Sequence, residues 1–224
     1  MKTTILVLLL VLASCLLWAE DPVAICTKVK GDVELARDGE TAALEQGAML
    51  YHNDVLTSAD ESYAAVKFVD GSSLLKLFPN SHLRLNATME DGQLNKRPYV
   101  EQGDVYSRVM HRAGVYEVES PTTVASVKGT EFLVRVKEDG TTELICMSGV
   151  VNFRNKRDNN EVDVGAGYTA VSNGQGPITT TPYDPEDVED ETQEMLEDEE
   201  VYQELRIDLE NAQGETRTLI FELK

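Results

Sequence analysis

The sequence predicts an all-β protein, folded as a compact sandwich or a short β-solenoid-like module of many short strands. Apolar and polar residues alternate over many short runs between residues 23 and 172, which is the period of half-buried strands. Gly and Asp separate these runs, where tight turns are expected. No stretch of this region carries the apolar stripe of an amphipathic helix. An acidic connector, helical or disordered, and a C-terminal β-hairpin are expected to follow.

Individual runs show the pattern clearly. In residues 30–39, Val33 and Leu35 alternate with polar neighbours. Residues 63–78 predict a hairpin, because two alternating runs flank Asp70-Gly71, and such a pair favours the positive φ of a tight turn.

A weak internal repeat indicates recurring sharp corners. Residues 30–50 and 148–168 share a Gly, an apolar pair, a polar turn and a return strand, and residues 102–118 follow this plan more weakly. Such a repeat is typical of a sandwich or a short solenoid-like coil.

Residues 1–19 are interpreted as a secretory signal peptide. A basic start precedes the apolar run from Ile5 to Leu12, which is short for a membrane span. A lipoprotein is the other interpretation: residues 1–14 would be removed and Cys15 would carry the lipid. In both cases we expect an extracytoplasmic chain, periplasmic or secreted, that meets the membrane only through such an anchor.

Charge divides the chain after the strand-rich domain. The net charge is −20, which argues against a nucleic-acid partner. Fourteen acids and one base lie in residues 184–210. We expect a Gly-, Pro- and Thr-rich linker at 173–184 and an acidic segment at 185–204. A docked helix and a solvated, partly disordered connector both stay open for that segment.

Residues 205–224 predict a β-hairpin with one apolar face. An isolated hairpin is only marginally stable in water, so this face is expected to cover the acidic segment, the main domain or a partner chain. The candidate partner face consists of Leu205, Ile207, Leu209, Leu219, Phe221 and Leu223.

The sequence shows no catalytic or metal-binding constellation. His52, His82 and His111 occur singly, without ligand spacing, and no nucleotide or hydrolase fingerprint is present. We therefore expect no enzyme activity, no cofactor and no metal site. Cys26 and Cys146 lie in strand-like runs, and both a disulfide and two separate buried thiols stay open.

Several motifs follow, in order, the pattern of one family. They include DVLT at 54–57, DGS at 70–72, VKGTEF at 127–132 and SGVV at 148–151. Over residues 25–171 the chain resembles the FecR-like domain family, named for the regulator of ferric dicitrate transport. The positions that carry the resemblance are Asp54, Thr57, Asp70, Gly71, Ser72, Gly103, Pro121, Gly129, Thr130, Glu131, Phe132 and Gly149.

The resemblance implies a compact extracytoplasmic module with no established catalytic residues. In the regulators of this family, the domain receives a signal outside the membrane and relays it to a cytoplasmic segment that acts on a sigma factor. Only four residues precede the apolar run here, so we expect that segment to be missing. The expected function is a non-catalytic protein-binding module in envelope signalling or assembly, with another envelope protein as partner. The alternative is a module that binds envelope glycan or peptidoglycan.

The KGTE motif at residues 128–131 is expected to be a corner of the fold. Gly129 would allow a bend or bulge, and Phe132 would begin a buried strand face. Thr130 and Glu131 are expected to hydrogen-bond the backbone or a nearby base.

Overall fold

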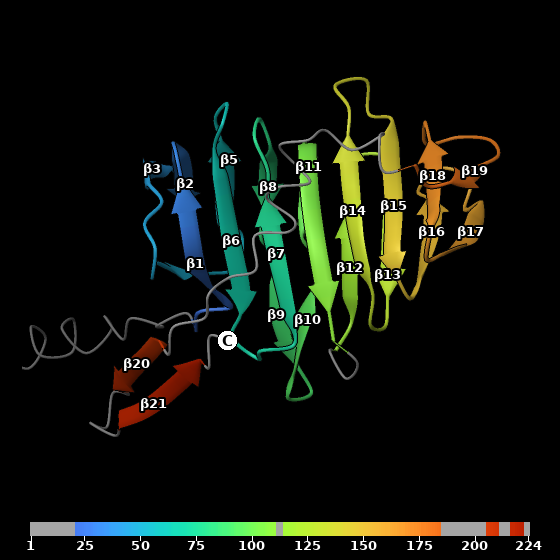
Figure 1. Cartoon of the computed structure of the whole chain (residues 1–224). Helices are drawn as coiled ribbons and strands as arrows, with labels where there is room; N and C mark the ends of the chain where they lie inside the picture. Colours follow the sequence, from blue (N-terminus) through green and yellow to red (C-terminus); the bar gives the residue numbers. More distant parts are fainter. Residues whose placement is uncertain (1–20, 111–113, 185–204, 211–215, 222–224) are drawn as a thin grey trace, which may run out of the picture.

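Two β-sheets face each other as a sandwich, with the first strand at one edge and the last strands of the domain at the other (Figure 1). The computed structural model describes residues 21–110, 114–184, 205–210 and 216–221, the last two ranges as backbone only. Within these ranges the chain forms strands and turns and no helix. The prediction of an all-β sandwich of many short strands is confirmed.

The first sheet, called here the front sheet, is antiparallel throughout. Its order is β4, β1, β6, β7, β11, β14, β15, β18 and β19. The bounds are β1 Ala24–Lys30, β4 Met49–Leu50, β6 Tyr63–Phe68, β7 Ser73–Leu77, β11 Tyr99–Val109, β14 Glu131–Val136, β15 Thr142–Ser148, β18 Tyr168–Ser172 and β19 Thr179–Pro182.

The second sheet, called the back sheet, has the order β3, β2, β5, β8, β11, β12, β13, β16 and β17. The hairpin of β9 and β10 joins it through β12. The bounds are β2 Val33–Arg37, β3 Glu40–Ala43, β5 Val55–Ser58, β8 His82–Arg84, β9 Ala87–Glu90, β10 Gln93–Lys96, β12 Tyr116–Glu119, β13 Thr123–Val127, β16 Val150–Asn155 and β17 Glu161–Gly165.

Strand β11 belongs to both sheets. Its first residues pair with β8 and β12 at the back, and from Gly103 onward it pairs with β7 and β14 at the front. Gly103 has φ +92°, and Ser81 packs directly against its Cα. A side chain at this position would collide with Ser81, so glycine allows the strand to change sheets.

The main core fills the space between the sheets. Phe68, Tyr116 and Phe132 meet edge to face, with ring centroids 6.1 and 6.5 Å apart. The Tyr116 hydroxyl donates a 2.9 Å hydrogen bond to Ser107 Oγ, and complete burial raises the pKa of this tyrosine. Each large apolar side chain buried in this way contributes about 1.5–3 kcal/mol.

The repeat prediction holds for two of its three units. Residues 30–50 include the β2–β3 hairpin and residues 148–168 include the β16–β17 hairpin, both in the back sheet. In residues 102–118 a second strand, β12, does follow the first, but the two do not form a hairpin. There β11 pairs with β7 and β14, and β12 meets β11 in parallel at Tyr99 and Glu119.

The segment expected to be a linker extends the front sheet. In residues 173–184, the threonine-rich strand β19 pairs with β18, so the linker prediction needs correction here. β-Branched threonine fits a pleated edge strand. Pro182 ends this strand, and its lack of an N–H group is tolerated because an edge strand has no neighbour on its outer side to accept a hydrogen bond. The sandwich therefore continues to the point where the acidic segment begins.

The predicted C-terminal hairpin is present as an antiparallel pair. Strand β20, Leu205–Glu210, pairs with β21, Thr216–Phe221. The side chains of its candidate partner face lie outside the described residues. The same holds for the expected signal peptide, for Cys15 and for the acidic segment at 185–204. The described part of the chain contains no helix with the length and apolar character needed to cross a membrane.

Two glycines occupy neighbouring corners between the sheets. Gly129, with φ +119°, lies where the chain passes from β13 to β14, and Gly149, with φ +81°, lies between β15 and β16. A Cβ atom at Gly149 would lie 2.7 Å from the Gly129 carbonyl oxygen and 2.7 Å from Thr130 Cγ2. The corner at Gly149 therefore depends on the absence of a side chain, because the neighbouring corner of Gly129 and Thr130 packs against it.

Gly149→Ala is expected to lower the free energy of unfolding by about 3 kcal/mol, because the new methyl group meets backbone and the φ is unfavourable. Gly92→Ala is the matched control: its φ is +77°, but no atom lies within 4 Å of the new Cβ. We expect a cost of about 1 kcal/mol there. Urea unfolding of both variants measures the difference, and equal losses would contradict the proposed corner packing.

Candidate functional site

The two sheets differ in their outer faces. The outer face of the front sheet has a buried apolar centre, whereas the outer face of the back sheet is polar. In the back sheet, outward Asn152 alternates with the buried Val151 and Phe153, as expected for a sheet that faces water. In the front sheet, Phe132 and Val134 belong to the main core, and Leu133 between them is also fully buried. The front sheet thus buries side chains on both of its faces.

The residues of this outer face form three rows that run across the strands. The strand register defines the central row as Ala65, Lys76, Tyr106, Leu133 and Ile145. One flanking row contains Asp104, Arg135 and Glu143, and the other contains Lys67, Leu74, Arg108 and Glu131. We call these three rows together the outer face.

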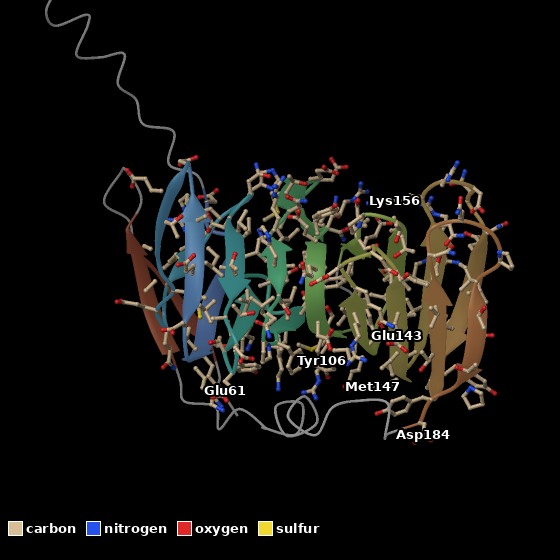
Figure 2. The ribbon with its side chains drawn as sticks, turned by 90° about the horizontal axis from the view of Figure 1, so that it is seen from above. Glu61, Tyr106, Glu143, Met147, Lys156 and Asp184 are labelled. Atoms are coloured by element: carbon tan, nitrogen blue, oxygen red, sulfur yellow. The ribbon has the colours of Figure 1, made fainter. Side chains whose placement is uncertain are left out.

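Apart from Lys76, the residues of the central row belong to a second apolar cluster, separate from the main core. This cluster consists of Tyr63, Ala65, Phe78, Tyr106, Leu133 and Ile145, with Leu74, Met147 and Tyr183 packed against it. Tyr106 is 3 % exposed, Ile145 1 % and Leu133 0 %. Figure 2 shows Tyr106, Glu143, Met147 and Asp184 along one side of the molecule and Lys156 on the opposite side.

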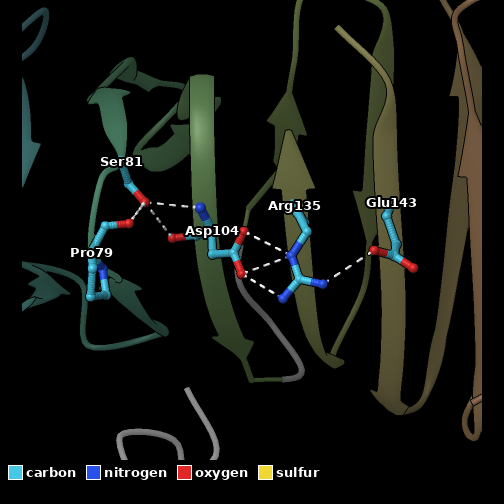
Figure 3. Close-up of polar contacts among 5 residues, drawn as sticks. All are labelled: Pro79, Ser81, Asp104, Arg135 and Glu143. Carbon is cyan, nitrogen blue, oxygen red and sulfur yellow. Dashed lines mark hydrogen bonds and ion pairs between the residues drawn. The ribbon is translucent and has the colours of Figure 1, made fainter. Parts of the chain in front are cut away.

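Arg135 is held between two carboxylates in the first flanking row (Figure 3). Its Nε and Nη2 donate to Asp104 Oδ2 at 3.0 and 2.9 Å, and its Nη1 donates to Glu143 Oε2 at 3.4 Å. Ser81 Oγ accepts from the Asp104 amide at 2.9 Å, and its hydroxyl donates to the carbonyls of Pro79 and Asp104. This fork-to-carboxylate geometry fixes the direction of the guanidinium group.

The other flanking row contains a second ion pair. Arg108 Nε lies 3.1 Å from Glu131 Oε1, and the Tyr106 hydroxyl donates to Glu131 Oε2 at 3.3 Å. Burial raises the pKa of Tyr106 to about 12, so its hydroxyl stays protonated near neutral pH and can donate. Charged groups therefore border the apolar central row on both sides.

An open pocket of about 420 Å³ adjoins the row of Arg135. Its polar lining residues include Asp60, Asn80, Gln102 and Lys137, and Phe78 lies at its base in the apolar cluster. No group of His, Cys, Asp and Glu in the described part of the chain has the arrangement of a metal site. The pocket is polar and mixed in charge, and Arg135 and Asp104 within it already bind each other.

Asp54 organises the turn before β5. Arg37 donates to both of its carboxylate oxygens at 2.7 Å, and the Tyr51 amide donates to Asp54 Oδ2 at 2.8 Å. The hydrogen bond to Asp54 raises the pKa of Arg37. Thr57, the last residue of the same DVLT motif, is exposed on β5 and takes no part in this network.

The DGS motif anchors a buried lysine. Asp70 Oδ2 lies 2.5 Å from Lys96 Nζ, and this ammonium also donates to Ser72 Oγ at 2.9 Å. The Lys96 side chain is completely buried, and its Nζ lies 5.8 Å from the centroid of the Phe68 ring. Gly71 gives the turn its positive φ of +68°. The motif thus joins the β6–β7 turn to β10.

The serine before Pro121 organises the β12–β13 turn. Ser120 Oγ accepts from the Thr123 amide at 2.9 Å and lies 2.9 Å from Thr142 Oγ1. Pro121 itself is exposed. Because Thr142 opens β15, this hydroxyl cluster joins a turn of the back sheet to a strand of the front sheet.

Of the two side chains of the KGTE motif expected to hydrogen-bond, Thr130 and Glu131, only Glu131 does so in the described part of the chain. Glu131 has the partners described above, whereas Thr130 Oγ1 is buried without a hydrogen-bond partner among the described residues. The prediction for Thr130 is therefore wrong: the methyl group of Thr130 packs where a Cβ of Gly149 would lie, and this packing fixes its position. Cys26 and Cys146 are two separate buried thiols.

Sequence reasoning missed the outer face, although a signal for it exists. Residues 63–66, 132–134 and 144–147 are uninterrupted apolar runs. Such runs are typical of strands that are buried on both faces, whereas half-buried strands alternate. The polar members of the outer face, Asp104, Arg135 and Glu143, come from three different strands and share no local spacing.

The fold and its corner residues define an all-β sandwich of the kind that the motifs predict. Residues 54–152 match the family described as FecR protein. The resemblance predicted from the motifs is therefore confirmed over that range. No curated protein matches the chain.

Two solved structures resemble the fold, each a crystal structure of a candidate anti-sigma factor from Parabacteroides distasonis ATCC 8503. The first, at 2.50 Å resolution, has a TM-score of 0.49 and 17 % identity, and the match covers 58 % of this chain and 60 % of the other. The second, at 1.65 Å, has a TM-score of 0.52 and 16 % identity, with 66 % of this chain and 67 % of the other covered. The match thus spans about three fifths to two thirds of the length of these proteins. The second similarity supports the same fold.

Asp70→Ala is expected to lower the free energy of unfolding by about 3–5 kcal/mol, because it leaves the buried Lys96 ammonium without its carboxylate. The double variant Asp70→Ala with Lys96→Met is expected to recover most of that loss, since a methionine fills the lysine site without a charge. Chemical unfolding of the two variants tests this. A double variant as unstable as the single one would contradict the role of the ion pair.

Proposed function

We propose that this protein is a non-catalytic protein-binding module in an extracytoplasmic signalling or assembly system, with another envelope protein as its partner. The observation that carries the proposal is the FecR domain at residues 54–152. FecR-like domains are extracytoplasmic parts of envelope signalling proteins, and the neighbours of similar fold are described as candidate anti-sigma factors.

The polar residues of the described sandwich support a binding role over a catalytic one. The family-motif carboxylates Asp54, Asp70 and Glu131 each form an ion pair with a base. Such paired groups hold turns and strands in position and are poorly placed to act as a nucleophile or general base. The signal-peptide and lipid-anchor interpretations belong to the same proposal, since both deliver the domain to the envelope.

A glycan-binding module is the second candidate. It is favoured by the polar pocket described above, whose lining residues include Asp60 and Glu138. Its amide and charged side chains suit hydroxyl groups, but its aromatic residue, Phe78, is 1 % exposed and cannot stack on a sugar ring. Co-sedimentation with purified sacculi separates the two candidates. Retention of the chain on sacculi, lost in the exposed pocket variant Asn80→Ala, would favour this second candidate.

The leading proposal predicts that the tagged full chain recovers one envelope protein reproducibly, identified by mass spectrometry, and that the tagged partner recovers this chain in return. Gly92→Ala and Gly149→Ala are matched variants, because the first leaves the corners intact and the second disturbs them. Binding is expected to persist in the first and to fall about tenfold or more in the second. Recovery of no common protein, or equal recovery by both variants despite unfolding of the second, would contradict the proposal.

A further inference from the structure

The outer face of the front sheet buries apolar side chains as a protein core does, but one sheet supplies almost all of them. Its apolar cluster takes all of its fully buried members from one sheet and the loop after β7, and a half-buried tyrosine, Tyr183, packs on it from beyond that sheet. Leu133 and Ile145 are almost completely buried on this face. One sheet alone would leave them exposed to water, which is unfavourable for apolar side chains, so a further layer must cover them. The question is which segment provides that layer.

We propose that the acidic segment of this chain, residues 185–204, docks on the outer face. Tyr183 packs against the cluster and Asp184 lies on the same side as Tyr106 and Met147 (Figure 2), so the chain enters the segment at this face. The segment contains eleven acids and no Lys or Arg. Between the acids it also carries apolar side chains, namely Val188, Met195, Leu196, Val201 and Tyr202.

The charges of the outer face fit such a segment. The three rows contain four bases, Lys67, Lys76, Arg108 and Arg135, and three acids, Asp104, Glu131 and Glu143. The outer face therefore carries one net positive charge, whereas the whole chain has a net charge of −20. Lys76 is only 4 % exposed, with its Nζ 5.9 Å from the centroid of the Tyr106 ring. A buried ammonium is stable beside carboxylates and costly elsewhere, and the acidic segment is rich in carboxylates. Apolar side chains of the segment over the central row, with its acids beside Lys67 and Lys76, would match this face.

The length of the segment is sufficient. Neighbouring strands lie about 4.8 Å apart, so the path from β15 across β14, β11 and β7 to β6 is about 19 Å. Twenty residues span about 30 Å even as a helix, and more when extended. The segment can therefore cross the whole apolar cluster before the hairpin strand β20 begins.

The same segment is a better occupant than a second copy of the chain. A tether of one or two residues after Tyr183 gives the segment an effective concentration in the millimolar range or higher. A second copy would bring another net charge of −20, and two such chains repel each other. This inference stands without the proposed function. If both hold, a partner that uses the outer face must compete with the acidic segment.

Zero-length carbodiimide cross-linking of the full chain tests the inference, since it joins lysines to carboxylates in direct contact. We expect links from Lys67 or Lys76 to acids of residues 185–204, at least about tenfold more abundant than links from Lys156 to those acids. Lys156 lies on the opposite side and is the internal control (Figure 2). Equal mixtures of ¹⁵N-labelled and unlabelled chain distinguish links within one chain from links between copies. Links spread evenly over these lysines, or found only between copies, would overturn the inference.

A pair of arginine variants gives a second readout. Arg108 is half-exposed on the outer face, and Arg97 is similarly exposed on the back sheet. Arg108→Gln is expected to speed cleavage of residues 185–204 by a glutamate-specific protease about threefold or more, because one ion-pairing group of the docking face is lost. Arg97→Gln is expected to leave the cleavage rate unchanged. Equal rates for both variants and the wild type would contradict docking on this face.

Discussion

Burial of the front sheet on both faces is the constraint on which the rest of the structure depends. The inner face packs against the back sheet, while Leu133, Ile145 and Tyr106 are equally buried on the outer face. A sheet of this kind needs a layer on each side. The polar outer side of the back sheet has no such need, so the sandwich has one face suited to water and one suited to protein. The two outer faces of the sandwich therefore differ in the layer that each requires.

The family motif and the outer face are largely different parts of the molecule, and Glu131 belongs to both. Gly129, Gly149 and Gly103 allow the chain to pass between the sheets, and Asp54 and Asp70 hold turns through buried ion pairs. These positions explain why the motif identifies the fold, because each corner tolerates few residue types. They lie mostly away from the central row. A domain of this kind can therefore keep its corners while the residues of its outer face change.

Local patterns predicted much of the fold. Alternation and the Asp70-Gly71 turn predicted the β6–β7 hairpin, and the motifs predicted the FecR domain. Pairings between distant segments, such as β1 with β6, could not be read from local patterns, because they depend on how the whole chain closes. Alternation also concealed the outer face, because it predicts strands that are buried on one face only, whereas Leu133 and Ile145 are buried on the other face of the front sheet. The row of Asp104, Arg135 and Glu143 exists only after three strands have paired.

The most direct test compares truncations on the two faces of the same sheet. Leu133 on the outer face and Leu144 on the inner face are both completely buried, on the neighbouring strands β14 and β15. In the full chain, we expect Leu133→Ala and Leu144→Ala each to lower the free energy of unfolding by about 2–5 kcal/mol. A loss of less than about 0.5 kcal/mol for Leu133→Ala, beside a full loss for Leu144→Ala, would show an outer face open to water. That result would contradict the account of a front sheet buried on both sides.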